Sequence, residues 1–209
     1  MDFNDSQQEA AFRKEARDFL EANAEKRSII SDKPNDKSPQ IAVAGAPETV
    51  KGGKEAAQEA LERAKIWQKK KAEAGFAAIL WPKEFGGYGG SPIQQVIYSQ
   101  EEHDYLVPSG YFEIGIGMLG PTMMVWGKDE DKKRYLPKMI TGEEIWCQLF
   151  SEPSAGSDLA GIKMKAEKDG DEWVLNGQKV WTSGAHFADY GMTVSYTHLT
   201  LPTVTQCRS

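Results

Sequence analysis

The stretch SEPSAGSD, Ser151–Asp158, combines serine, glycine and alanine with two carboxylates and a proline. It stands between an apolar run, IWCQLF, and an amphiphilic one, LAGIKMKAEK. Small residues let backbone amides approach a ligand closely, and consecutive amides in a turn form an anion-binding concavity. The hydroxyls of Ser151, Ser154 and Ser157 add hydrogen-bond donors to such a site. The alternative interpretation is a tight polar turn in which Asp158 caps its own backbone.

The composition of the 209-residue chain is that of a folded protein with an acid excess. Hydrophobic residues make up 40% and charged residues 27%, and the net charge of −6 argues against a non-specific nucleic-acid binder. Two cysteines, Cys147 and Cys207, without CxxC spacing exclude a disulfide framework and a cysteine-rich zinc site. The longest apolar run, residues 76–81, is too short to cross a bilayer, and the N-terminus lacks the apolar region of a secretory signal. We therefore expect a cytoplasmic protein without a transmembrane segment.

The first two-thirds of the chain have the periodicity of helices. A capping box, Ser6 to Glu9, begins the first helix, because each residue can satisfy the other's free amide. An apolar stripe at helical spacing follows, made of Phe12, Ala16, Phe19 and Leu20. From residue 28 to residue 53 Pro, Gly, Ser, Asn and Lys dominate, which predicts a long connection.

Further helices follow this connection. The stretch KEAAQEALERAKIWQKKKAEAG carries an apolar stripe and ends at Gly75, where a left-handed C-cap belongs. Ser91 followed by Pro92 is a cap and first-turn signature, which predicts a helix through about Asp104. The stretch DEDKKRYLPKM adds a short helix, which we expect Pro137 to stop.

After the helices the period changes to that of strands. IWCQLF and YGMTV are short apolar strands, and two turn dipeptides of tight hairpins lie between them, Asp169-Gly170 and Asn176-Gly177. We therefore expect an antiparallel meander in this part of the chain. Helices first and strands afterwards predict an α+β fold, with an all-α domain over residues 1–144 and a β domain over residues 145–194.

A second chemical feature is VWTSG, residues 180–184, at the end of the last hairpin strand. An exposed indole beside two hydroxyl residues suits one wall of a site for a planar heterocycle, whereas the alternative is a core Trp followed by a turn. The chain has no GxGxxG motif, because Pro92 takes the place of the last glycine, and no GxxxxGK[ST] motif. A nucleotide cofactor is therefore not held in a Rossmann or P-loop manner.

The stretch WCQLFSEPSAGSDLAGIKMKAEKDGDEWVLNGQKVWTSGAHFADYGM resembles the middle domain of the acyl-CoA dehydrogenase family. The family signature is [ST]-E-P-x-A-G-S-D, then a hairpin with N-G-x-K and a W-x-[ST] triplet, and both halves stand at the expected separation. WPKEFGGYGG and GPTMMVWGKDEDKKRYLPKMITGEEIW resemble the helical N-terminal domain of the family. The likeness spans residues 3–192 apart from the connection. It implies an N-terminal helical domain followed by an incomplete, antiparallel, β-barrel-like middle domain.

The resemblance implies that the two motifs hold FAD. The residues expected to line the cofactor are Gln148, Phe150, Ser151, Gly156, Ser157, Trp181, Thr182 and Ser183. The amide and hydroxyl of Ser151 are expected at the pyrimidine edge of the flavin, Trp181 against the ring, and the hydroxyl of Ser183 near N5. Ser157 is also expected to contact the thioester chain of the substrate. Ser154 and Ser183 depart from the commoner Gly and Thr of the family but keep a small or hydroxyl character.

The family reaction is α,β-dehydrogenation of an acyl-CoA thioester, with hydride transfer to flavin N5 and electrons passed to an electron-transfer flavoprotein. The base of the family is a Glu of a C-terminal helical domain, which the resemblance does not find in this chain, so no catalytic residue is assigned here. Glu152 and Asp158 are interpreted as caps of the loop. A homo-oligomer is implied for the full-length protein. Residues 195–209 do not resemble the family, and we interpret them as the product of a truncated or misjoined reading frame.

Two other functions stay open at this point. Acyl-CoA oxidases and flavin monooxygenases share the scaffold, and a non-catalytic module that uses the helices as a docking surface is a third class. No motif encodes the length or branching of the acyl chain. The resemblance places the floor of the acyl cavity between helices at residues 93–102 and 118–125.

Overall fold

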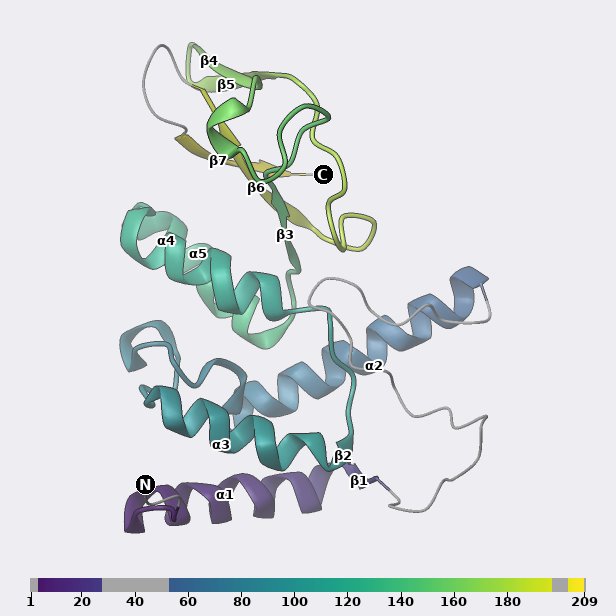
Figure 1. Ribbon diagram of the computed structural model, residues 1–209, viewed down its shortest axis with the longest axis vertical. Coiled ribbons are helices and arrows are strands. Elements are labelled where there is room, and N and C mark those ends of the chain that lie inside the picture. Colours follow the sequence, from purple (N-terminus) through teal and green to yellow (C-terminus); the bar gives the residue numbers. More distant parts are fainter. Residues whose placement is uncertain (1–3, 28–52, 197–202, 209) are drawn as a thin grey trace.

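The computed structural model describes residues 4–27, 53–196 and 203–208, the last range as backbone only. Figure 1 shows two parts stacked along the long axis. The helical half (residues 4–27 and 53–144) forms one end, and the β half (residues 145–196 and 203–208) forms the other. This arrangement confirms the predicted α+β fold. The connection at residues 28–52 lies outside the described residues, and within those residues no helix is long and apolar enough to cross a membrane.

Helices α1 (Gln7–Asn23) and α3 (Pro92–His103) begin at capping boxes and lie side by side (Figure 1). The predicted box at the start of α1 is confirmed, because the Glu9 amide donates to Ser6 Oγ at 3.3 Å and the Ser6 amide donates to Glu9 Oε2 at 2.7 Å. Ser91 makes the same exchange with the residue three positions on. Local sequence signals therefore set both helix starts.

The other helices of this half are α2 (Gly53–Glu73), η1 (Phe76–Ala78), η2 (Lys83–Phe85), the π-helix η3 (Gly115–Leu119), α4 (Gly120–Trp126) and α5 (Asp129–Thr141). Residues from these helices and the turns between them pack with two residues of the β half in one core. The core is made of Ala78, Trp81, Leu119, Met123, Leu136, Met139, Ile140, Trp146 and Met192. Two of these residues, Trp146 and Met192, belong to the β half. The two halves are therefore joined by one shared core.

Helix α5 continues through Pro137 and ends at Gly142, which has φ 76°. The prediction that Pro137 stops this helix was wrong. Pro137 is exposed, as is Lys133 one turn before it, so water can replace the hydrogen bond that the missing proline amide would have made. The burial of Met139 and Ile140 then holds the last turn against the core.

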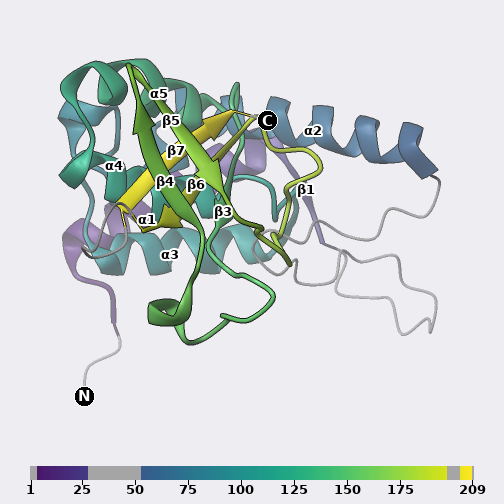
Figure 2. The ribbon, with the colours of Figure 1, turned by 90° about the horizontal axis from the view of Figure 1, so that it is seen from above.

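The β half contains a three-stranded sheet in the order β3-β6-β7 and a hairpin of β4 and β5. The bounds of these strands are Trp146–Leu149 for β3, Lys165–Asp169 for β4, Glu172–Asn176 for β5, Tyr190–Ser195 for β6 and Thr203–Arg208 for β7. A separate short pair, β1 (Glu25–Lys26) with β2 (Tyr105–Leu106), lies at one end of the helices. Seen from above in Figure 2, the hairpin lies across the helical half.

The pairing of β3 with β6 is parallel, which differs from the purely antiparallel arrangement that we expected. A long excursion of the chain separates the two strands, and it is long enough to return β6 in the same direction. The pairs β6–β7 and β4–β5 are antiparallel. Within the described residues these strands form two open sheets, so the barrel-like closure stays a prediction.

One of the two predicted hairpin turns is present. Gly170 has φ 59° between β4 and β5, which confirms the turn at Asp169-Gly170. The prediction of a hairpin turn at Asn176-Gly177 was wrong, because within the described residues no strand after Gly177 pairs with β5. A Cβ atom at Gly177 would lie 2.7 Å from the Cβ of Met164, so this glycine permits a close approach of two chain segments.

Candidate functional site

The serine loop (Ser151–Asp158) leaves β3 and turns back on itself. The amide of Glu152 donates to the carbonyl of Ala155 at 2.8 Å, and the amide of Ala155 donates to the carbonyl of Glu152 at 3.0 Å. A side chain at Gly156 would meet no atom within 4 Å, so the loop borders open space there. The stretch therefore forms a tight turn, and Gly156 within it faces open space.

A buried ion pair supports the loop from behind. The carboxylate of Glu152 lies 2.9 Å from Lys179 Nζ, and their side chains are 4% and 6% exposed. The same carboxylate accepts the amides of Lys163 at 2.6 Å and Met164 at 3.0 Å, while Lys179 Nζ donates to the carbonyl of Phe150 at 2.9 Å. One pair of side chains therefore connects three separate segments of the β half.

The charge of Glu152 is stabilised in this position. Burial raises the pKa of its carboxyl, but the hydrogen bond from Lys179 and the amides of Lys163 and Met164 outweigh burial and lower the pKa below its ordinary value. Glu152 thus supports the loop as a carboxylate, in line with the interpretation of a structural residue. Asp158 differs from that interpretation, because its side chain makes no cap hydrogen bond and its carbonyl accepts the Gly161 amide instead.

The indole segment (Val180–Gly184) lies beside the serine loop. The amide of Val180 donates to the carbonyl of Ser151 at 3.0 Å, so the next residue, Trp181, is held close to the start of the loop. Trp181 is 78% exposed and has φ 54°. It is the only non-glycine residue of the described chain with positive φ. A bulky side chain in this region costs about 1–3 kcal/mol, and such strain is concentrated at ligand sites.

The structure places the predicted cofactor residues along these two segments. Gln148 lies in β3, and it is half-buried, as are Phe150, Ser151 and Thr182, whereas Gly156, Ser157, Trp181 and Ser183 are exposed. The bond between Val180 and Ser151 brings the two motifs together. Among the described residues, Ser157 and Ser183 make no hydrogen bond across the two segments, and the cofactor roles of all eight residues stay predictions.

The polar groups of these segments fit the hydrogen-bonding edges of a flavin. In the described part of the chain, the amides of Ser151, Gly156 and Ser157 donate to no backbone carbonyl. The hydroxyls of Ser151 and Ser183 likewise have no protein partner among the described residues. Free donors beside an exposed indole suit a planar ligand with polar edges.

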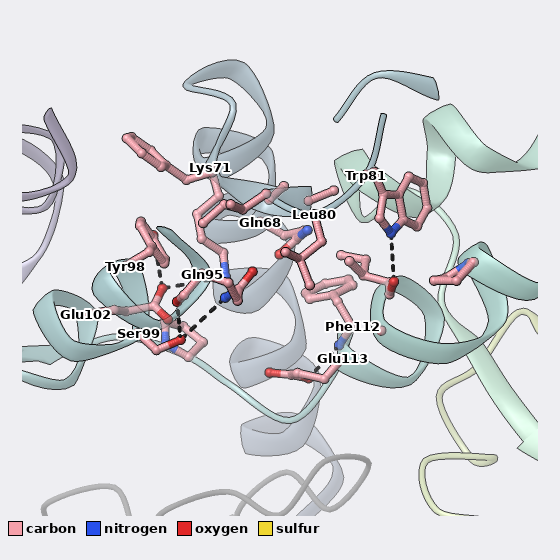
Figure 3. A pocket seen from close by; sticks show the side chains of 18 residues that line it. Gln68, Lys71, Leu80, Trp81, Gln95, Tyr98, Ser99, Glu102, Phe112 and Glu113 are labelled. Atoms are coloured by element: carbon pink, nitrogen blue, oxygen red, sulfur yellow. Dashed lines mark hydrogen bonds and ion pairs between the residues drawn. The ribbon is translucent and has the colours of Figure 1, made fainter. Parts of the chain in front are cut away.

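A cavity of about 400 Å³ lies in the helical half (Figure 3). Its wall includes Ser99 of α3 and Phe112, which precedes η3. The ring of the neighbouring Tyr111 contacts Phe187 with ring centroids 5.2 Å apart, and Phe187 lies three residues beyond the indole segment. The segment that borders the cavity therefore also contacts the chain that follows the indole segment.

The sequence analysis did not predict two residues that contribute to the site or to the cavity. Lys179 is the Lys of the N-G-x-K signature, but no local pattern shows that it is buried against Glu152, which is 27 positions away. Gln68 of α2 lines the cavity at 2% exposure and was not among the predicted site residues. A single Gln among apolar stripe positions was the available signal.

Comparisons with known proteins identify the family of the chain. The family model described as "Acyl-CoA dehydrogenase, N-terminal domain" matches residues 6–143, and "Acyl-CoA dehydrogenase, middle domain" matches residues 147–205. The chain belongs to the acyl-CoA dehydrogenase family. The middle-domain match extends to residue 205, beyond residue 192, where the likeness was expected to end, and the origin of the tail stays a prediction.

Relatives of this acyl-CoA dehydrogenase chain include the acyl-CoA dehydrogenase IpdE1 of Mycobacterium tuberculosis, which is 40% identical over 146 residues, 70% of this chain and 38% of that protein. The crystal structure of the ChsE4–ChsE5 complex from Mycobacterium tuberculosis matches with a TM-score of 0.70 and 25% identity, over 100% of this chain and 49% of that chain. A glutaryl-CoA dehydrogenase from Mycobacterium smegmatis, in complex with FADH2, shares the fold at a TM-score of 0.60 and 18% identity, over 97% of this chain and 46% of that chain. The chain spans less than half the length of these relatives.

Proposed function

We propose that this chain forms the N-terminal and middle domains of an FAD-dependent enzyme that removes hydrogen from the α and β carbons of an acyl-CoA thioester. The observation that carries the proposal is the hydrogen bond from the Val180 amide to the Ser151 carbonyl. It brings the serine loop and the exposed indole to one place, in a chain whose two halves match the two family models in order. The family match supports the reaction, and the free donors support the cofactor.

The two segments have distinct parts in this proposal. The amide and hydroxyl of Ser151 hold the pyrimidine edge of the ring system, while Trp181 covers one face of it. Ser183 directs its hydroxyl toward N5, and Gly156 and Ser157 leave room for the pyrophosphate and the thioester arm. Gln148, Phe150 and Thr182 complete the lining. FAD, when bound, supplies the acceptor for the β-hydride, and preorganised donors at its polar edges favour the reduced form.

The base that removes the α-proton is not assigned to any described residue. Glu152 is buried, and its carboxylate is already bonded to Lys179 and two amides, so it is not available to a substrate. We propose that the base comes from a C-terminal helical domain of the full-length enzyme, as in the family. An electron-transfer flavoprotein as the electron acceptor and a homo-oligomeric assembly are further parts of the proposal.

The test is a titration of the chain with FAD, followed by flavin fluorescence and absorbance. We expect one FAD per chain and a Trp181→Ala variant with about 5- to 150-fold weaker binding, because one base-stacking aromatic contributes about 1–3 kcal/mol. The matched control is Trp126→Ala, since Trp126 is 82% exposed in the helical half and should leave the affinity unchanged. Failure of the chain and of its full-length form to bind FAD would favour the non-catalytic module. Rapid reoxidation of the reduced full-length protein by air would favour an oxidase.

A further inference from the structure

The cavity of the helical half has an uncommon chemical lining for a site that takes a plain hydrocarbon chain. Its apolar wall is made of Phe76, Ile79, Leu80, Trp81, Phe112 and Ile116. Polar side chains make up much of the remaining wall, namely Gln68, Lys71, Gln95, Tyr98, Ser99, Glu102 and Glu113. Figure 3 shows them directed toward the same space from α2, from α3 and from the segment before η3.

Most of these polar groups already have protein partners. The Tyr98 hydroxyl donates to Glu102 Oε1 at 3.1 Å, and Lys71 Nζ lies 3.6 Å from the same oxygen. The Ser99 hydroxyl donates to the carbonyl of Gln95 at 2.9 Å. The Glu113 carboxylate accepts two backbone amides at 2.8 and 3.0 Å. These groups are therefore committed to the wall of the cavity.

The side chain of Gln68 differs from the others because it is a buried amide, whereas Gln95, whose Oε1 also has no donor among the described residues, is half-buried. Gln68 is 2% exposed, and its Nε2 donates to the carbonyl of Ile140 at 2.8 Å. That bond fixes the orientation of the amide and leaves Oε1 as a directed acceptor. The described residues offer Oε1 no donor, yet it is not enclosed by protein, so it opens into the cavity. An acceptor on a largely buried side chain that borders a cavity is favourable only when a ligand or a water molecule there supplies the hydrogen bond.

We propose that the cavity takes an acyl group that carries a hydroxyl, and that this hydroxyl donates to Gln68 Oε1. The inference rests on the proposed function, since it assumes that the cavity receives the acyl part of a thioester. A saturated chain of the same length would cover Oε1 without giving it a donor. A site built around such a polar group discriminates against the analogue that lacks its partner. Gln68 is therefore the residue that determines specificity for a hydroxylated acyl group.

The test compares octanoyl-CoA with three derivatives that carry one hydroxyl on one of the last three chain carbons. Affinities for the FAD-loaded chain are measured by isothermal titration calorimetry, with CoA alone as the baseline. We expect at least one hydroxylated thioester to bind about tenfold or more tightly than octanoyl-CoA, as a site that hydrogen-bonds its ligand should. In Gln68→Met the preference should fall to about twofold or less, while octanoyl-CoA binds as well as before or better.

Ser99→Ala is the matched control, because Ser99 lines the same cavity but its hydroxyl is bound to Gln95. This variant should keep the preference. If Gln68→Met does not fold, as judged by its thermal transition, the affinities of the wild-type chain for the four thioesters test the inference without the variant. Equal binding of all four, or a preference that survives in Gln68→Met, would overturn the inference and leave the proposed function intact. Absence of binding by every thioester would contradict both.

Discussion

The helical half and the β half differ in the burial of their aromatic side chains and in the pairing of their polar groups. In the helical half, Phe12, Phe76 and Tyr98 are buried together, and the carboxylate of Glu101 is paired with two arginines of α1. In the β half, Trp181 is 78% exposed in a strained conformation, next to amides and hydroxyls that have no partner in the described part of the chain. The helical half pairs these groups with one another, whereas the β half leaves an aromatic ring exposed beside donors that have no partner among the described residues.

This difference teaches where function lies in the chain. Side chains that bury and pair with each other stabilise the fold, while strain and unpaired donors in an ordered segment indicate a binding role. In the described part of the helical half, Trp67 Nε1 and Glu144 Oε2 are buried without a partner, and Gln68 Oε1, also without a donor, borders the cavity. Substitutions of residues that support the fold should change the free energy of unfolding, whereas substitutions of residues that bind a ligand should change the affinity for that ligand.

The largest effect is expected at the ion pair behind the serine loop. Glu152→Ala leaves the Lys179 ammonium buried and uncompensated, which should cost about 3–5 kcal/mol in the free energy of unfolding. Urea denaturation followed by circular dichroism measures this loss. The matched control is Lys14→Met, which breaks the exposed pair with Asp18 and should change stability by no more than about 0.5 kcal/mol. Similar losses in the two variants would show that the pair does not support the β half.

The next effect concerns the packing of the helical half. A Cβ atom at Gly120 would lie 2.1 Å from the Trp81 ring, so Gly120→Ala should destabilise the chain by about 1–3 kcal/mol through overpacking. Gly117 is the control, since a Cβ there meets nothing within 4 Å and Gly117→Ala should be neutral or stabilising by up to about 1 kcal/mol. Thermal unfolding separates the two variants. Equal melting temperatures would contradict the close packing of Trp81.

The smallest effect is a pH dependence that arises in the β half. Glu152 has a lowered pKa in the folded state, so the stability it contributes is present above its unfolded pKa, about 4.3, and is lost as pH falls through the folded value. Glu152→Gln removes this titration and should flatten the fall in unfolding free energy between about pH 5 and pH 3. Urea denaturation at several pH values measures the slope. If the unfolding free energy of Glu152→Gln fell with decreasing pH as steeply as that of the wild type, this role of the carboxylate would be refuted.

Much of the fold follows from local sequence signals. The capping box at Ser6, the Ser91-Pro92 start and the Asp169-Gly170 turn act over a few residues, and the structure confirms each of them. The effects of Pro137 and Gly177 depend instead on burial and on a distant neighbour, which a local pattern does not contain. The parallel pairing of β3 with β6 is likewise a long-range property.

The candidate site was predictable only in part. The family signature indicated that Ser151 and Trp181 lie close together, and the bond from Val180 to Ser151 bears this out. The partnership of Glu152 with Lys179 was not predictable, because two charged residues 27 positions apart give no sign that they share one buried space. The cavity acceptor on Gln68 depends on the orientation of a single amide, which only the three-dimensional structure provides.

The most direct test of the central claim is amide hydrogen exchange, measured by mass spectrometry with and without FAD. The claim is that the serine loop and the indole segment grip one flavin together. We therefore expect FAD to slow exchange in peptides covering residues 150–158 and 179–184 at the same ligand concentrations, while peptides of α1 stay unchanged. Protection of only one segment, or of neither while FAD is bound, would contradict the account.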